Sequence, residues 1–234
     1  MKIGVFGCSF SEGGGLNSPD FLKFAIKNNL LPKGKYNHKD EKREAVMKYH
    51  RYSTLVGKEL SCEVDNYAKS RGSNEYILKT LYENYKKYDV CIVQFSYYFR
   101  QYIWSDKQKK FHNVNGLYKM PDMPQDVIDY FEKTHTEYHN EDYEKSKISM
   151  FVKLFDNLLK DKKVIWLFQD HIPENLETNN LVSFDSIEGN GNIAKYIEEN
   201  KLDLTSATNG EFNDGHYSVE GHQKIADKII ERLK

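Results

Sequence analysis

Residues 2–15 read KIGVFGCSFSEGGG, and this stretch decides the fold class. Lys2–Phe6 is a short apolar run that stops at Gly7, a pattern typical of a buried strand. The glycine-rich segment Ser11–Gly15 that follows predicts a loop without regular structure. We therefore expect Ser9 directly after the first strand, at the carboxyl edge of a sheet.

Further apolar runs predict more buried strands, and helical patterns separate them. Strands are expected at Cys62–Tyr67, Val90–Phe95, Val164–Phe168 and Leu181–Phe184. Helices are expected over residues 77–85, 148–159 and 219–233, with Ser73 and Ser218 as N-caps of the first and the last. This alternation predicts an α/β fold, a three-layer α/β/α sandwich with a central, mostly parallel five-stranded sheet in doubly wound order. Active sites in such folds lie at the carboxyl ends of the strands.

Length and composition limit the function classes. The 234 residues favour a single domain over 1–234, with an aromatic-rich insertion at about 97–140 that we interpret as a lid or substrate wall. Lys and Arg number 34 against 35 Asp and Glu, which argues against a nucleic-acid partner. No run approaches the ~20 apolar residues that span a bilayer, and the N-terminus lacks a signal-peptide pattern. We expect a cytoplasmic protein without a membrane partner, and the three cysteines fit a reducing compartment.

A serine hydroxyl is a weak nucleophile, and it needs a base within hydrogen-bond reach that a third group orients. Ser9 follows the first strand, and Asn213-Asp214-Gly215-His216 lies just before the last helix. Ser9, His216 and Asp214 are therefore candidates for nucleophile, general base and orienting acid. Cys8 is the competing nucleophile, but we expect its side chain to point back into the sheet.

Three blocks, in order along the chain, resemble those of the SGNH (GDSL-like) hydrolases. Gly7-Cys8-Ser9-Phe10 is similar to the first block, in which Asp usually stands between Gly and Ser. Arg71-Gly72-Ser73-Asn74 is similar to the second, whose Gly donates a backbone N–H to the oxyanion. His216 is followed five residues later by Gly221-His222 and an apolar helix, as in the last block. The resemblance implies a serine esterase that needs no cofactor, with an oxyanion hole formed by Ser9, Gly72 and Asn74.

Two positions depart from the family pattern. The third block is usually Gly-x-Asn after the next strand, and this chain has Gln94-Phe95-Ser96 there. We expect the Asn74 amide to substitute, with local bonding at the helix start as the alternative. The acid usually stands three residues before the His, where this chain has Asn213, and Asp214 is the expected replacement. The alternative to Asp214 is a Ser-His dyad aided by a backbone carbonyl.

Other signals carry less chemistry. No Gly-x-Gly-x-x-Gly or Gly-Lys-Ser/Thr phosphate loop occurs, so no nucleotide is expected. Asp170-His171 and His222 lack metal-ligand spacing, so we expect no metal site. Arg100 and Trp104 follow the third strand and are candidate substrate-binding residues, with surface ion pairing as the alternative.

The resemblance implies hydrolysis of an ester through an acyl-enzyme. The aromatic-rich insertion favours a carbohydrate or other small ester as substrate, with an O-acetyl or similar acyl group removed, because flat rings bind sugar faces. Two alternatives stay open. One is a decayed site that binds glycan without cleaving it, and the other is an acyltransferase that uses the same serine.

Overall fold

The computed structural model describes residues 1–115, 123–138, 140–186, 191–212 and 214–234. Its central sheet is parallel and has the strand order β2-β1-β3-β6. The predicted α/β class and parallel sheet are confirmed, because strands buried on both faces read as continuous apolar runs. The strands are β1 (Lys2–Phe6), β2 (Glu63–Asn66), β3 (Val90–Phe95) and β6 (Lys163–Phe168).

The prediction of a fifth strand at Leu181–Phe184 is wrong. Leu181 forms only an isolated parallel bridge with Trp166, whose backbone N–H donates to Asn180 O at 3.0 Å. Three residues beyond the bridge, the Phe184 N–H donates to Gly191 O at 3.0 Å instead. The backbone of this segment divides its hydrogen bonds between two partners, so no ladder forms. Among the described residues the sheet therefore has four strands where we expected five.

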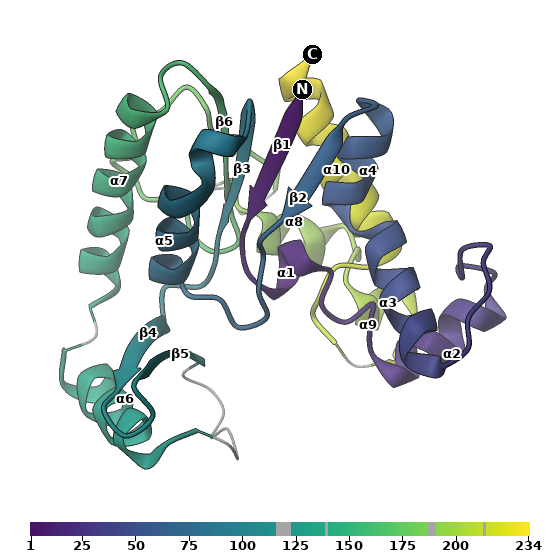
Figure 1. Cartoon of the computed structure of the whole chain (residues 1–234), viewed down its shortest axis with the longest axis horizontal. Coiled ribbons are helices and arrows are strands. Elements are labelled where there is room, and N and C mark those ends of the chain that lie inside the picture. The colour runs from purple at the N-terminus through teal and green to yellow at the C-terminus, as the bar shows by residue number, and fades with distance from the viewer. Residues whose placement is uncertain (116–122, 139, 187–190, 213) are drawn as a thin grey trace.

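Helices cover both faces of the sheet (Figure 1). α5 (Asn74–Asn84) and α7 (Glu141–Leu158) lie on one face, and α4 (Tyr52–Glu59) and α10 (Val219–Leu233) lie on the other. The predicted serine caps are present, since Ser73 Oγ accepts the Tyr76 N–H and Ser218 Oγ accepts the Gly221 N–H. Further helices are α2 (Pro19–Lys27), α3 (Lys39–His50), the 3₁₀ turn Tyr85–Lys87, α8 (Ile193–Glu199) and α9 (Leu204–Ala207).

The aromatic-rich segment 97–140 forms a small unit at the carboxyl edge of the sheet (Figure 1). It contains the antiparallel hairpin of β4 (Arg100–Ser105) and β5 (Lys110–Asn115), followed by α6 (Gln125–Tyr138). One face of the hairpin packs on α6 through a separate apolar cluster, formed by Ile103, Val114, Val127 and Phe131. Residues 116–122 and 139 of the predicted insertion lie outside the described residues.

The chain after β1 is helical where we expected a loop from Ser11 onward. Ser9–Glu12 forms one helical turn, α1, in which the Glu12 N–H donates to Cys8 O at 3.0 Å. Gly13 ends the turn with φ at 94°, a left-handed conformation that favours glycine. The glycines therefore terminate a helix that begins at Ser9.

A buried polar network lies between α1 and the sheet, with Gln94 at its centre. Gln94 Oε1 accepts the hydroxyls of Ser11 at 2.5 Å and Tyr52 at 3.2 Å. Gln94 Nε2 donates to the Tyr217 hydroxyl at 2.7 Å, and Tyr217 in turn donates to Gln169. Gln94, which stands where the third block usually has glycine, thus links α1 to Tyr217, the residue after His216.

We expect Gln94→Leu to be strongly destabilising, because it leaves the buried hydroxyls of Ser11, Tyr52 and Tyr217 without this partner. A buried polar group without a partner costs about 1–3 kcal/mol, so the free energy of unfolding should fall by roughly 3 kcal/mol or more. Urea denaturation measures the change. The matched control is Ile92→Val on the same strand, which removes one buried methylene and should cost about 1 kcal/mol. Equal losses in the two variants would contradict the network's role.

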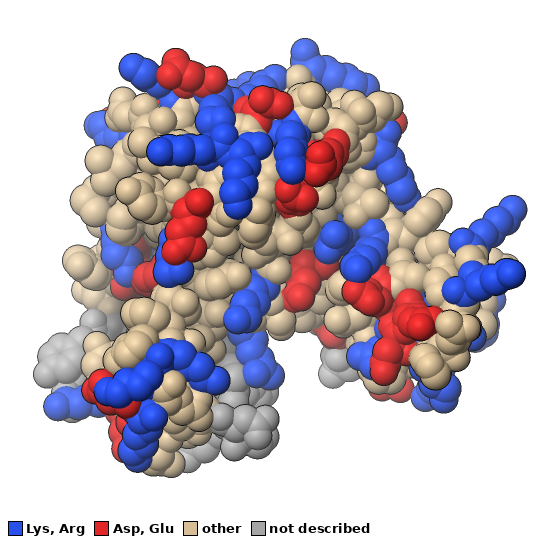
Figure 2. Space-filling view, viewed as in Figure 1, with Lys and Arg blue, Asp and Glu red and all other residues tan. Residues whose placement is uncertain are grey.

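Charges of both signs are mixed on the face of the molecule that Figure 2 shows. Figure 2 shows Lys and Arg interspersed with Asp and Glu over this face, and many form pairs such as Lys48–Glu44 at 2.6 Å and Lys79–Glu83 at 2.7 Å. The face is hollowed between the β4-β5-α6 unit and the α2-α3 unit, below the carboxyl edge of the sheet (Figure 2). Within the described ranges, every helix is too short or too polar to cross a bilayer.

Candidate active site

Ser9, His216 and Asp214 form a continuous hydrogen-bonded chain. His216 Nε2 lies 3.0 Å from Ser9 Oγ, and His216 Nδ1 lies 2.5 Å from Asp214 Oδ1. An ionised carboxylate only accepts hydrogen bonds, so the Nδ1–H donates to Asp214 and leaves Nε2 to accept the Ser9 hydroxyl proton. This tautomer is the one that a general base facing a serine requires.

Two rigid elements position the nucleophile and the base. Ser9 is the first residue of α1, directly after β1, so it stands at the carboxyl edge of the sheet. The loop that carries the other two residues is held by α9: the Leu204 N–H donates to His216 O at 2.8 Å, and the Asp214 N–H donates to Thr205 Oγ1 at 2.8 Å. The Phe10 ring packs on the imidazole at a centroid distance of 4.7 Å. The hydrogen bonds to α9 and the packing of Phe10 therefore hold the imidazole in place.

The electrostatics keep Asp214 ionised. Burial alone would raise the pKa of this carboxyl, but hydrogen bonds from the ring and the backbone N–H of His216 outweigh burial and lower its pKa below the usual range. Asp214 is therefore a carboxylate at neutral pH and able to stabilise the imidazolium that forms when His216 takes a proton.

Glu12 is a second carboxyl near the imidazole, and sequence reasoning did not single it out. Burial raises the pKa of Glu12, while a hydrogen bond from the Ser70 backbone and the nearby charges of Arg51 and His216 act in the opposite direction. It stands at the end of α1, one turn after Ser9, and a titratable residue at this spacing was its only sequence signal.

Two glycines leave the space that the imidazole and the carboxylate occupy. A Cβ at Gly14 would lie 2.8 Å from His216 Nε2 and 2.9 Å from Ser9 O. A Cβ at Gly15 would lie 3.2 Å from Asp214 Oδ2, and its φ of 80° also favours glycine. The run of three glycines is visible in the sequence, but it predicted only a loop.

The three predicted oxyanion donors differ in their hydrogen-bond partners. The backbone N–H of Ser9 opens α1, where helical N–H groups have no intrahelical acceptor. The Gly72 N–H donates to Lys69 O at 2.9 Å in this structure. The Asn74 amide is buried and binds the backbone of Ser96, with Oδ1 accepting its N–H at 2.7 Å and Nδ2 lying 3.5 Å from its carbonyl oxygen. The amide therefore clamps the start of α5 to the end of β3, and its role as an oxyanion donor stays a prediction.

We expect Asn74→Ala to lower kcat for an activated ester by about a hundredfold while KM changes little, since an oxyanion donor acts mainly in the transition state. Steady-state kinetics on folded variant protein tests this. A drop in thermal stability without a matching drop in kcat would show that Asn74 only clamps Ser96.

No protein-family model matches the chain, and no curated protein matches it. Solved structures with a similar fold include esterases. A psychrotrophic esterase from Pseudoalteromonas sp. is 10% identical, with 99% of this chain and 96% of that chain covered and a TM-score of 0.45. An acetyl xylan esterase from the rumen bacterium Butyrivibrio proteoclasticus is 10% identical, covers 99% of this chain and has a TM-score of 0.47. A family two carbohydrate esterase from Clostridium thermocellum, in complex with cellohexaose, is 10% identical over the whole of this chain, with a TM-score of 0.44.

This chain spans 63% of the length of the Butyrivibrio and Clostridium proteins. The identities and TM-scores are low, so the chemistry of this site rests on the contacts of its own residues.

The cysteines lie apart from this chemistry. Cys8 is fully buried in the main apolar cluster, as we expected from its place one residue before Ser9. Burial raises the pKa of the Cys91 thiol to about 12, and burial also raises the pKa of Cys62. All three cysteines are free thiols.

The two remaining candidate residues lie on the β4 strand. Arg100 is buried, whereas Trp104 is largely exposed and donates its indole N–H to Asp106 at 3.1 Å. The two side chains thus differ in exposure to solvent. Substrate contact by Trp104 stays a prediction.

The two other histidines that the sequence analysis named, His222 and His171, have different partners. His222 is fully buried, its Nδ1 accepts the Tyr52 N–H at 3.3 Å, and burial lowers its pKa to about 3. His171 follows β6 at the far side of the sheet, and its carbonyl accepts the Tyr98 hydroxyl at 2.5 Å. Among the described residues, no three His, Cys, Asp or Glu side chains are grouped closely enough to hold a metal ion.

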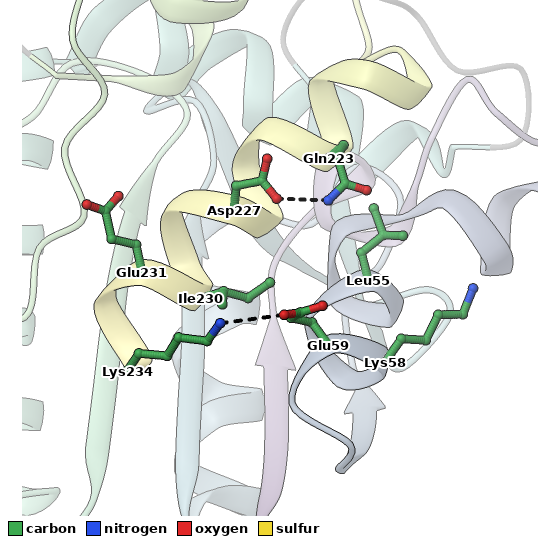
Figure 3. A pocket seen from close by; sticks show the side chains of 8 residues that line it. All are labelled: Leu55, Lys58, Glu59, Gln223, Asp227, Ile230, Glu231 and Lys234. Carbon is green, nitrogen blue, oxygen red and sulfur yellow. Dashed lines mark hydrogen bonds and ion pairs between the residues drawn. The ribbon is translucent and has the colours of Figure 1, made fainter.

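A groove between α4 and α10 carries no comparable chemistry (Figure 3). Within it, Lys234 Nζ lies 3.5 Å from Glu59 Oε1, and Gln223 Nε2 donates to Asp227 at 2.8 Å. Lys163 Nζ, at the start of β6, binds Leu233 O at 2.7 Å, so this end of α10 lies at the amino ends of the strands. The groove is lined by Leu55, Lys58, Glu59, Gln223, Asp227, Ile230, Glu231 and Lys234.

Proposed function

We propose that this protein is a serine-dependent ester hydrolase that works through an acyl-enzyme. The observation that carries the proposal is the hydrogen-bonded chain Ser9–His216–Asp214 at the carboxyl edge of the sheet. The three side chains come from opposite ends of the sequence, and Ser9 and His216 are 207 residues apart. A nucleophile, a base and an orienting carboxylate in this order are the requirements for acyl transfer.

The first half of the reaction forms the acyl-enzyme. Ser9 Oγ attacks the ester carbonyl carbon while its proton passes to His216 Nε2, and the imidazolium is stabilised by the Asp214 carboxylate. The resulting oxyanion is stabilised by the Ser9 N–H, with the Asn74 amide and the Gly72 N–H as the further donors; the bond from Gly72 to Lys69 must then be exchanged. His216 returns the proton to the alkoxide as the C–O bond breaks.

The second half releases the acid. Water attacks the Ser9 ester while His216 Nε2 takes its proton, and His216 then protonates Ser9 Oγ as the carboxylic acid leaves. The residues of the chain supply every proton transfer in this sequence, so the proposal requires no cofactor.

The proposed substrate is a carbohydrate or other small ester that carries an O-acetyl or similar acyl group. The feature that supports it is the aromatic face of the β4-β5 hairpin at the carboxyl edge, where Tyr102 stacks on Phe111 at 4.6 Å and Trp104 meets the same ring at 5.0 Å. Flat rings of this kind suit the faces of sugars and small aromatic leaving groups.

Turnover of p-nitrophenyl acetate tests the proposal. The wild-type protein should release p-nitrophenol over many turnovers, and His216→Ala protein should not. A folded protein that binds acetylated oligosaccharide without turnover would instead support the decayed binding site. Transfer of the acetyl group to an added sugar in preference to water, found by product analysis, would support an acyltransferase.

A further inference from the structure

Arg100 is a buried cation, and within the described part of the chain it forms no ion pair. Its side chain is 6% exposed, and neither Nε nor Nη1 of its guanidinium has a hydrogen-bond partner. The contact that the guanidinium makes is with the face of the Tyr97 ring, whose centroid lies 5.4 Å from Cζ. By contrast, the partly buried Lys147 pairs with both Glu75 at 2.9 Å and Glu144 at 2.5 Å.

Two aromatic rings link Arg100 to the proposed active site. Tyr97, under the guanidinium, packs against Phe10 at a centroid distance of 5.9 Å, and Phe10 packs against the His216 imidazole. Ser96, at the end of β3, adds a second buried polar group without a partner, its Oγ. Two unsatisfied groups therefore stand within one short segment at the same edge of the sheet as Ser9.

The hairpin presents Arg100 toward this edge. Side chains alternate along a strand, so Arg100 shares its face of β4 with Tyr102, while Ile103 faces α6. Tyr102 contacts the Tyr76 ring of α5 at 5.9 Å. On the neighbouring strand, Asn113 Oδ1 accepts the Ser73 N–H at 3.1 Å, which ties the hairpin to the loop that precedes α5.

A buried charge without a partner is costly, and the cost falls when an anion binds. The guanidinium is always protonated and offers five N–H donors in a plane, a geometry that matches a carboxylate. We propose that Arg100 binds a carboxylate of the substrate, so that the enzyme prefers esters carrying a negative charge near the scissile bond. This inference rests on the proposed esterase function.

Two matched ester pairs test the preference and locate the charge. Mono-p-nitrophenyl succinate against p-nitrophenyl acetate places the carboxylate on the acyl side, and 4-acetoxybenzoate against methyl 4-acetoxybenzoate places it on the leaving group. We expect the wild-type protein to favour the anionic member of one pair in kcat/KM. Arg100→Gln should lower that anionic-to-neutral ratio about tenfold or more, mainly through KM of the anionic ester, and Arg100→Lys should lower it less.

The control is Lys110→Gln, which removes an exposed positive charge from the same hairpin and should leave the ratio as it is in wild type. A binding measurement on wild-type protein needs no variant: benzoate should inhibit hydrolysis of p-nitrophenyl acetate competitively and more strongly than benzamide.

A wild-type enzyme that hydrolyses both neutral esters but favours neither anionic partner, and is inhibited equally by benzoate and benzamide, would overturn the inference and leave the esterase function intact. An equal ratio in wild type and folded Arg100→Gln would also overturn it. Loss of the esterase function itself is recognised separately, by the absence of turnover for all four esters.

Discussion

Ser9→Ala is expected to lower kcat/KM for p-nitrophenyl acetate by about three decades or more, because it removes the atom that forms the acyl-enzyme. Ser9 Oγ is the hydroxyl that lies 3.0 Å from His216 Nε2. Since the three side chains act as a unit, His216→Ala should cost about as much, and the double variant should cost little more than either single one. Steady-state kinetics with purified variants measures all three losses.

The matched control for Ser9→Ala is Cys8→Ala, the neighbouring residue. Cys8 is fully buried in the main apolar cluster and makes no part of the hydrogen-bonded chain. Its loss should lower stability somewhat and leave the Ser9-dependent reaction in place. The assignment of the nucleophile is wrong if Cys8→Ala abolishes turnover while Ser9→Ala retains it.

Gly14→Ala is expected to lower kcat/KM about a thousandfold, close to the loss in His216→Ala. The added Cβ would lie 2.8 Å from His216 Nε2, nearer than carbon and nitrogen atoms approach, so the imidazole must leave its place beside Ser9. The neighbouring contact at 2.9 Å is with the backbone oxygen of Ser9, which lies in α1 and has little freedom to move away. The measurement is kcat/KM, with the melting temperature recorded to show that the variant folds.

The matched control is Gly215→Ala, between Asp214 and His216. A Cβ at Gly215 meets nothing within 4 Å. This variant should keep activity within a few-fold of wild type, since surface substitutions without new contacts have small effects. Similar large losses in Gly14→Ala and Gly215→Ala would mean that the loop, and not the space beside the imidazole, determines activity.

The sequence predicts the bounds of two strands correctly, and both are buried along almost their whole length. Lys2–Phe6 is apolar after Lys2 and Val90–Phe95 is apolar apart from Gln94, and the structure gives both strands these bounds. The Leu181–Phe184 run is apolar apart from Ser183, but it meets the sheet at one position, at Trp166. Whether an apolar run becomes a strand depends on the partners its backbone finds, and the run itself does not contain that information.

The sequence predicted which residues of the candidate site meet, but it did not predict the contacts that hold them in place. The pairing of Ser9 with His216 follows from the order of the blocks, because both flank elements whose ends meet at the carboxyl edge. The close approach of Gly14 to the imidazole depends on where the loop around His216 comes to rest. The partners of Asn74 likewise depend on tertiary contacts, since its amide binds the backbone of Ser96 at the end of a different strand.

The identity of the nucleophile is the central claim, and covalent labelling tests it most directly. Wild-type protein is incubated with a fluorophosphonate probe, digested with trypsin, and the labelled peptide is fragmented in a mass spectrometer. Trypsin should release residues 3–23, which contain Cys8, Ser9 and Ser11 in one peptide. The account predicts a phosphonyl adduct on Ser9 that is absent in Ser9→Ala. An adduct on Cys8 or Ser11, or unlabelled protein that still turns over p-nitrophenyl acetate, would contradict it.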